Sequence, residues 1–210
     1  MLNAKMELIA EKIVKRFGHF LVLKNISFKV SSGSAIAITG PNGSGKTTLV
    51  KILCNLMAPT RGQVVYQNNS QKINREDIFQ YIGLVGPYLQ LYQELSAQEN
   101  IDFFARMRNL KNYSARVKQL MELFNLSGRE HDAVKTYSSG MQQRLKYVCA
   151  LIHEPEVLFV DEPRSNLDQA GIEVVYSILQ EQKKDKILVI STNDQEDLTL
   201  ADQIIRVGVA

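Results

Sequence analysis

The stretch of sequence that determines the fold reads Gly40-Pro41-Asn42-Gly43-Ser44-Gly45-Lys46-Thr47. We call it the phosphate loop, because the pattern G-x-x-x-x-G-K-[ST] is typical of loops that bind nucleotide phosphates. Its glycines let successive backbone N–H groups converge on phosphate oxygens with no Cβ in the way. An apolar strand is expected just before it, from Ala35 to Thr39, and a helical pattern follows from Lys46 to Leu56. The positive N-terminal end of such a helix favours a bound anion.

Two side chains of this loop and two carboxylates farther along the chain predict ATP and Mg²⁺ as ligands. Lys46 is expected to reach the β- and γ-phosphates, and the Thr47 hydroxyl is expected to ligate Mg²⁺. Val157–Val160 has the pattern of an apolar strand, and Asp161 and Glu162 follow it directly. Such a strand is commonplace by itself. After a phosphate loop it predicts that Asp161 holds Mg²⁺ through water and that Glu162 orients or deprotonates the attacking water.

Hydrophobic periodicity predicts strands in the first and last thirds of the chain and helices in the middle. The strands are expected at 6–17, 21–30, 35–39, 62–66, 81–85, 157–160, 187–191 and 203–207, and the helices at 46–56, 96–110, 114–126, from 139 to before 154, and 169–182. Strands that alternate with helices predict an α/β fold with a mostly parallel sheet and an all-helical insert. Together with the phosphate loop, this order resembles a P-loop NTPase (RecA-like) core with an antiparallel β-subdomain and an inserted α-helical subdomain. We expect one domain over 1–210, in which 1–87 and 154–210 form the core with the β-subdomain and 88–153 form the helical subdomain.

Composition argues against several other classes of protein. The 210 residues are enough for one well-buried domain, and 45% hydrophobic and 22% charged residues are ordinary for a globular chain. A net charge of +3 without a clustered basic face predicts that nucleic acid is not a partner. Cys54 and Cys149 are expected to be free thiols in a reducing compartment. No run approaches the ~18–20 apolar residues of a membrane span, and Met1–Met6 lacks the form of a signal peptide, so we predict a cytoplasmic protein that reaches a membrane only through a partner.

A further motif opens the last helix of the middle part and reads Tyr137-Ser138-Ser139-Gly140-Met141-Gln142-Gln143-Arg144. By itself it indicates a helix N-cap and a turn. Between the phosphate loop and Asp161 it completes a set of motifs, and the sequence resembles the ATP-binding subunit of an ABC transporter over essentially its whole length. The resemblance makes the phosphate loop with Thr48 the Walker A motif and Val157–Asp161 the Walker B motif. It places Glu162 at the catalytic glutamate and Phe17 where an aromatic ring stacks on adenine.

The resemblance also implies an assembly. The signature loop of the family corresponds to Ser138-Ser139-Gly140-Met141-Gln142, the D-loop to Ser165-Asn166-Leu167-Asp168, and the stretch that faces the membrane subunit to Leu91–Asn100. In such proteins two ATP-binding subunits close head to tail, so that each ATP lies between the Walker A motif of one and the signature loop of the other. The implied partners are an integral-membrane transporter subunit and a second ATP-binding subunit, like or unlike this chain. The protein would lie on the inner face of the cell membrane, and its size is similar to that of the haem-exporter ATP-binding subunit, although fold-level likeness leaves the substrate open.

Two positions depart from the family pattern. Pro87 stands where the Q-loop glutamine is expected, and it has no side-chain amide for Mg²⁺ or the attacking water. Gln90 lies three residues farther on, and the sequence leaves open whether it substitutes. Asn193, which we assign to the catalytic group with Lys46 and Glu162, stands where the family has a histidine. Asparagine can donate a hydrogen bond but cannot carry the charge or the proton of a histidine.

These departures lead to two hypotheses. In the first, the subunit binds ATP and the ATP-binding dimer closes, but hydrolysis at its own site is slow. The subunit then either lends its signature loop to a more typical partner or has a regulatory or structural role in a heteromeric or non-transport ABC complex. In the second, it forms a homodimer in which Glu162 alone supports adequate turnover. The remaining expectations concern packing. Phe103, Phe104 and Met121 should lie in the core, and His153 should be a helix C-terminal residue without a catalytic role.

Overall fold

A parallel β-sheet forms the centre of the computed structural model, which describes residues 5–208. Its five strands lie in the order β6 (Ile82–Val85), β7 (Val157–Asp161), β8 (Ile187–Ser191), β3 (Ser34–Thr39) and β9 (Gln203–Arg206). Every neighbouring pair is parallel. β7 and β8 are buried along their whole length, which explains why both have nearly continuous apolar sequences. Residues 1–4 and 209–210, the ends of the expected domain range, lie outside the described residues.

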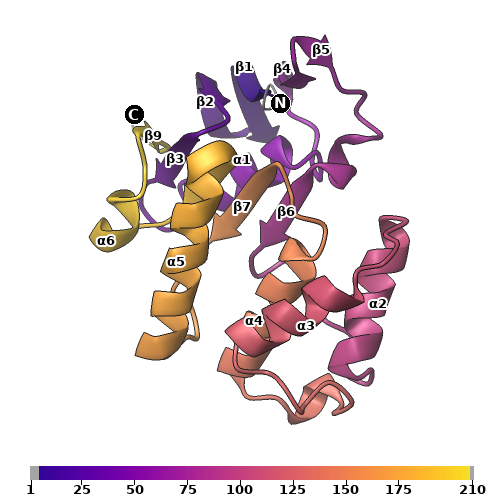
Figure 1. The fold of residues 1–210 in the computed structure, drawn as a ribbon. Helices are drawn as coiled ribbons and strands as arrows, with labels where there is room; N and C mark the ends of the chain where they lie inside the picture. Colours follow the sequence, from indigo (N-terminus) through magenta and orange to yellow (C-terminus); the bar gives the residue numbers. More distant parts are fainter. Residues whose placement is uncertain (1–4, 209–210) are drawn as a thin grey trace.

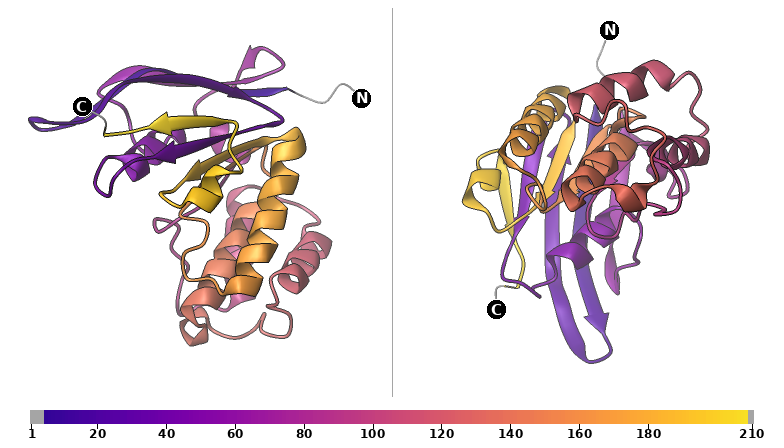
Figure 2. Two further views of the ribbon diagram at one scale, coloured as in Figure 1. Left: turned by 90° about the vertical axis from the view of Figure 1, so that its left-hand side faces the viewer. Right: turned by 90° about the horizontal axis from the view of Figure 1, so that it is seen from below.

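The N-terminal strands form a second, antiparallel sheet, as the sequence predicts. Its strands lie in the order β2 (Phe20–Ser31), β1 (Met6–Phe17), β4 (Arg61–Asn68) and β5 (Gln71–Lys72). Figure 2 shows this sheet lying over the parallel sheet, and Leu49 and Ile52 of α1 (Lys46–Leu53) are buried in a cluster with residues of both sheets. Sequence patterns did not predict β5, whose two residues are exposed and therefore carry no apolar signal.

Three helices from the middle of the chain form a group of their own. They are α2 (Ala97–Met107), α3 (Ser114–Leu123) and α4 (Ser139–Leu151), and Figure 1 shows them below the sheets and next to α5 (Gln169–Asp185). The predicted capping box of α2 is present: the Ser96 hydroxyl accepts the Glu99 N–H at 3.2 Å, and the Glu99 carboxylate accepts the Ser96 N–H at 2.7 Å. The remaining helical segments are η1 (Ile78–Gln80), η2 (Val134–Thr136) and α6 (Gln195–Leu198), which sequence patterns did not predict because each is only about one turn long.

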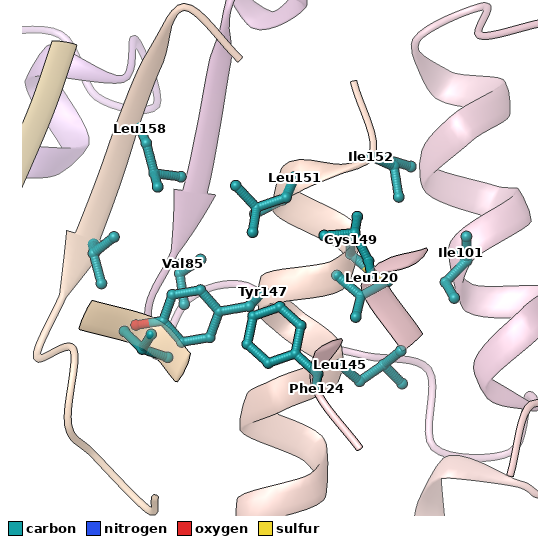
Figure 3. Close-up of a cluster of buried hydrophobic side chains, with 14 of the residues drawn as sticks. Val85, Ile101, Leu120, Phe124, Leu145, Tyr147, Cys149, Leu151, Ile152 and Leu158 are labelled. Carbon is teal, nitrogen blue, oxygen red and sulfur yellow. The ribbon is translucent and has the colours of Figure 1, made fainter. Parts of the chain in front are cut away.

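An apolar cluster joins this helical group to the parallel sheet, and Figure 3 shows its centre. The rings of Phe124 and Tyr147 stack with their centroids 5.6 Å apart. Val85 of β6 and Leu158 of β7 belong to the same cluster. The Tyr147 hydroxyl donates a hydrogen bond to the carbonyl oxygen of Pro163 at 3.1 Å, immediately after the end of β7 and Glu162. The helical group is therefore anchored to the segment that carries the predicted catalytic carboxylate.

One predicted core residue lies at the surface instead. Phe103 of α2 is 36% exposed, whereas Phe104 is partly buried and Met121 is 1% exposed. Ile101 and Ala105 lie two residues before and after Phe103 and are both fully buried. Two residues correspond to about 200° around a helix, so the side chain between them must point away from the core. The prediction for Phe103 is therefore wrong, and those for the other two side chains are confirmed.

His153 lies just beyond the end of α4, as predicted, and its environment opposes protonation. Its Nε2 is 3.0 Å from the carbonyl oxygen of Ile82, and its buried Nδ1 has no hydrogen-bond partner among the described residues. Burial is the main cause that lowers the pKa of His153 to about 4; the positive charges of Arg108 and Lys186 lower it further, and the Ile82 carbonyl opposes them. An unfolded chain would protonate this histidine at a pH near its ordinary pKa of about 6.5.

We therefore expect the free energy of unfolding to fall as the pH falls from about 6.5 to about 4. In that interval the unfolded chain binds a proton that the folded chain does not, so acid favours unfolding. Denaturant titrations across the interval should show this loss, and His153→Gln should reduce it. The matched control is His131→Gln, because His131 is exposed. An equally steep pH profile in the His153 variant would contradict the prediction.

Candidate functional site

The phosphate loop joins β3 to α1 at the carboxyl end of the parallel sheet, and its backbone requires glycine. Gly40 and Gly45 have φ angles of 153° and 103°, which residues with a side chain rarely adopt. A Cβ at Gly40 would lie 2.3 Å from the carbonyl oxygen of Val207, and one at Gly45 would lie 2.7 Å from the Val22 side chain. The close packing of β2 and of the segment after β9 around the loop therefore leaves no room for other residues at these positions.

Lys46 brings a positive charge into this loop. It is the first residue of α1 and is 8% exposed, and its Nζ donates to the carbonyl oxygens of Gly40 at 2.7 Å and Pro41 at 3.4 Å. It forms no ion pair with any residue in 5–208, and the first turn of α1 contains no acidic residue. The helix N-terminus and the ammonium group thus lie together with no carboxylate paired directly to the ammonium, which favours an anionic ligand such as a phosphate chain.

Two carboxylates lie beside the loop. Asp161 ends β7 and is 4% exposed, and its Oδ2 accepts a hydrogen bond from the Thr47 hydroxyl at 3.0 Å. Glu162 follows in a left-handed conformation, with φ 56°, and its N–H donates to the carbonyl oxygen of Ser191 at 2.8 Å. Burial, and next the charge of Asp161, raise the pKa of Glu162 above its ordinary value, and Lys46 opposes this shift. A hydroxyl and a carboxylate are the few protein ligands that Mg²⁺ takes when phosphates and waters supply the rest, so these residues fit that ion.

One open cavity of about 500 Å³ brings half of the predicted site residues together. Its lining consists of Phe17, Val22, Asn42, Gly43, Gly45, Lys46, Thr47, Thr48, Pro87, Asp161 and Glu162. Phe17 lies at its edge and is 46% exposed, with the Lys15 ammonium 5.0 Å from the centroid of its ring. The cavity thus combines an accessible aromatic ring, a cation and two carboxylates. Pro87 presents its ring at the position where a glutamine is expected from the sequence.

Asn193 lies next to the phosphate loop. Its Oδ1 accepts the Gly40 N–H at 3.3 Å, and its Nδ2 donates to Oδ1 of Asn42 at 3.2 Å. The next residue, Asp194, forms an ion pair with Arg164 at 2.9 Å. The segment after β8 is therefore tied both to the phosphate loop and to the segment after β7.

The predicted signature loop, Ser138 to Gln142, does not lie beside the phosphate loop. Ser138 is the N-cap of α4 and accepts the Met141 N–H at 3.2 Å, and a Cβ at Gly140 would lie 2.9 Å from the carbonyl oxygen of Asn166. Ser138 and Ser139 are exposed, and Gln142 donates to the carbonyl oxygen of Tyr137 at 3.2 Å. Figures 1 and 2 show α4 in the helical group, away from α1. One chain thus does not bring this loop to its own phosphate loop.

Residues 23–165 match the protein family described as ABC transporter. The chain belongs to this family. It is 36% identical over 159 residues to a daunorubicin resistance ATP-binding protein of Streptomyces coeruleorubidus, with 75% of this chain and 50% of that protein covered. It is 33% identical over 198 residues to an uncharacterized ABC transporter ATP-binding protein of Bacillus subtilis, with 93% and 65% covered. It therefore spans about half to two thirds of the length of these curated ABC transporter relatives.

Solved structures of ABC transporter proteins share the fold. One, described as the structure of an ATP-binding subunit of an ABC transporter, superposes with a TM-score of 0.84 at 26% identity and covers 95% of this chain and 85% of that one. This confirms the predicted fold class, with its P-loop core, antiparallel β-subdomain and helical insertion. Within the described range, no helix is both long and apolar enough to cross a bilayer.

Sequence patterns did not predict one charged residue of the site. The Arg164 guanidinium lies 2.9 Å from Asp194 and 2.8 Å from Glu196, and so links the segments after β7 and β8. The available signal was a basic residue two positions after Glu162. Its partners lie about thirty residues farther along the chain, and only the pairing of β7 with β8 brings them within reach.

Proposed function

We propose that this chain is the ATP-binding subunit of an ABC transporter and hydrolyses ATP to drive export through a separate integral-membrane subunit. The observation that carries the proposal is the cavity in which the phosphate loop, Lys46, Asp161 and Glu162 meet. Membership of the ABC transporter family supports it. Export is supported by the relative from Streptomyces coeruleorubidus, whose description assigns it to daunorubicin resistance.

In this proposal the cavity binds ATP with Mg²⁺. Phe17 stacks on the adenine, and the phosphate loop with Thr48 surrounds the phosphates through its backbone N–H groups. Lys46 compensates the charge of the β- and γ-phosphates, and Thr47 and Asp161 would hold Mg²⁺. The ion supplies further neutralisation of the phosphate charge. The protein's part is to position these groups in a partly buried site, where electrostatic interactions are stronger than in water.

Hydrolysis then depends on Glu162. Its raised pKa makes its carboxylate a better proton acceptor than an ordinary exposed glutamate, because a base is more effective as its pKa approaches the working pH. The Asn193 amide, which now contacts Gly40 and Asn42, donates to the γ-phosphate when ATP is bound. The signature loop, Ser138 to Gln142, completes the ATP site of a second ATP-binding subunit, since it lies away from the phosphate loop of its own chain.

The proposal includes an organisation and a location. Residues 88–153 form the helical subdomain of a single ABC domain, and the rest forms the core with its β-subdomain. The chain would lie on the cytoplasmic face of the membrane, held there by the membrane subunit. Binding of Mg·ATP, release of phosphate, and co-purification of a membrane protein from detergent extracts test the three parts separately. A protein that neither binds Mg·ATP nor hydrolyses it would overturn the proposal.

A hydrolysis-impaired subunit with a regulatory or structural role is the second candidate, and Asn193 is the observation that favours it. A neutral amide forms a weaker hydrogen bond to a phosphate than a charged imidazole does. We expect Asn193→His to raise the hydrolysis rate on the order of tenfold, because a charged donor contributes about 1–1.5 kcal/mol more than a neutral one. Phosphate release at saturating Mg·ATP measures this.

The control for that variant is Asn193→Gln, which keeps a neutral amide and should bring no increase. Equal rates in the parent protein and the histidine variant would show that asparagine does not limit hydrolysis. The impaired-subunit alternative would then lose its support, and the homodimer in which Glu162 suffices would be favoured.

A further inference from the structure

The segment after β6 contains a buried hydroxyl group that forms no hydrogen bond with the part of the chain that the structure describes. Tyr88 follows Pro87, and its side-chain oxygen is buried without a hydrogen bond to any described residue. Pro87 itself is exposed and lines the nucleotide cavity. Gln90, the nearest amide in the sequence, is exposed and does not belong to the lining of that cavity. A buried hydroxyl without a hydrogen bond lowers the stability of the folded protein. We therefore expect it to gain a hydrogen-bond partner in another state of the site.

The ring of Tyr88 lies against the segment that ends in Asp161. Gly86 makes this possible, because a Cβ there would lie 3.0 Å from Cζ of Tyr88 and 3.2 Å from Cβ of Asp161. The carbon that carries the hydroxyl and the carbon that carries the carboxylate are therefore neighbours across one glycine. The Lys51 ammonium lies 5.3 Å from the centroid of the ring and helps to hold it in place.

Asp161 is the acceptor that suits this hydroxyl best. Its carboxylate lies across Gly86 from the hydroxyl, and after burial it is the first group that raises the pKa of Tyr88, both through its charge and as a hydrogen-bond acceptor. The contact does not meet the distance and angle of a formed hydrogen bond in this structure. In this structure Asp161 accepts one side-chain hydrogen bond, from Thr47. A carboxylate has lone pairs for a second donor and for a metal ion as well.

We propose that Tyr88 is a positioning residue for the Mg·ATP site, whose hydroxyl donates to the Asp161 carboxylate when Mg·ATP binds. Together with Thr47 it fixes the rotation of the carboxylate, as hydrogen bonds around metal ligands commonly do. Tyr88 thus replaces, through Asp161, the contribution that Pro87 cannot make. This inference rests on the proposed function, because it assigns a new residue to that same site.

Tyr88→Phe tests the inference, because it removes only the hydroxyl. Its matched control is Tyr66→Phe: Tyr66 is also buried, but its hydroxyl donates to the carbonyl oxygen of Leu53 at 2.8 Å. In the nucleotide-free protein, the Tyr66 variant should have a lower Tm, since a satisfied hydrogen bond is lost. The Tyr88 variant should have an unchanged or higher Tm, since an unsatisfied hydroxyl is removed.

The second measurement is a Mg²⁺ titration in the presence of a non-hydrolysable ATP analogue, which should increase Tm. The quantity compared between variants is the Mg²⁺ concentration at which half of this increase is reached. Loss of a hydrogen bond to a metal ligand typically weakens metal binding 10- to 100-fold, so Tyr88→Phe should raise this concentration about tenfold or more. Tyr66→Phe and Gln90→Ala should leave it unchanged.

Three results would contradict either the role of Tyr88 or the proposed function. An unchanged Mg²⁺ requirement in Tyr88→Phe would overturn the inference and leave Tyr88 as a packing residue. An increase in Gln90→Ala instead would assign the role to that amide. If the parent protein shows no Mg²⁺-dependent stabilisation by the analogue at all, the proposed function itself fails, which separates the two claims.

Discussion

Glu162→Gln is expected to lower the rate of ATP hydrolysis about a hundredfold to ten-thousandfold, the usual contribution of a positioned general base. The carboxylate lies in the nucleotide cavity beside Asp161, held by a left-handed turn and by the hydrogen bond from its N–H to Ser191. Glutamine has nearly the same shape but cannot accept the proton of the attacking water. Binding of Mg·ATP should remain, because the phosphate loop and Lys46 are untouched. Phosphate release and nucleotide binding, measured on the same preparation, separate the two effects.

The pH dependence of the reaction provides a further check on Glu162. Burial and the neighbouring Asp161 raise its pKa above the ordinary value of 4.5, so the rate should fall with acidification at a pH above that value. The protonated carboxyl group cannot act as a base, which is why the loss occurs on the acid side. The residual rate of Glu162→Gln should lack this acid limb. Glu181→Gln, on the exposed face of α5, is the control and should behave like the parent protein. A Glu162 variant with an undiminished rate would assign the base to another group.

Lys46→Met should abolish most of the affinity for Mg·ATP, with a loss on the order of a hundredfold or more. Lys46 is the one cation among the described residues that line the cavity, and its ammonium is held by the carbonyl oxygens of Gly40 and Pro41 at the centre of the loop. Methionine fills a similar volume, so the loop should keep its shape while losing the charge that faces the phosphates. Equilibrium binding of a fluorescent ATP analogue measures the effect.

Folding of the Lys46 variant serves as its internal check. The variant should still unfold in one cooperative transition with at most a modest decrease in Tm, because the lost hydrogen bonds to Gly40 and Pro41 are offset by a charge that no longer has to be desolvated. The control variant is Lys184→Met, which removes an exposed lysine of α5 that pairs with Glu181. If the Lys46 variant is folded and binds Mg·ATP as tightly as the parent protein, the phosphate loop does not bind phosphate in the way proposed here.

Much of the fold could be predicted because its signals are local. The apolar runs of β7 and β8, the helical spacing in α2 and α3, and the capping box at Ser96 each depend on a few consecutive residues. Boundaries were less predictable. α1 ends at Leu53 and not at Leu56, because Asn55 adopts a left-handed conformation with φ 64° and turns the chain back. Phe103 was misplaced because the sequence shows that a residue is apolar, but only the packed helix shows which face is covered.

The sequence by itself determined the phosphate loop, Gly40 to Thr47. Glycines at defined positions, a lysine and a hydroxyl residue at the start of a helix form a site whose geometry is set within eight consecutive residues. Asp161 and Glu162 could be predicted equally well, because they directly follow an apolar strand. What only the tertiary structure decided is which distant side chains face that loop: Asn193 beside Gly40, Arg164 beside Asp194, and Tyr88 beside Asp161. These contacts depend on the strand order β6-β7-β8-β3-β9. Packing between segments far apart in the chain sets this order, so it cannot be predicted from any single stretch of sequence.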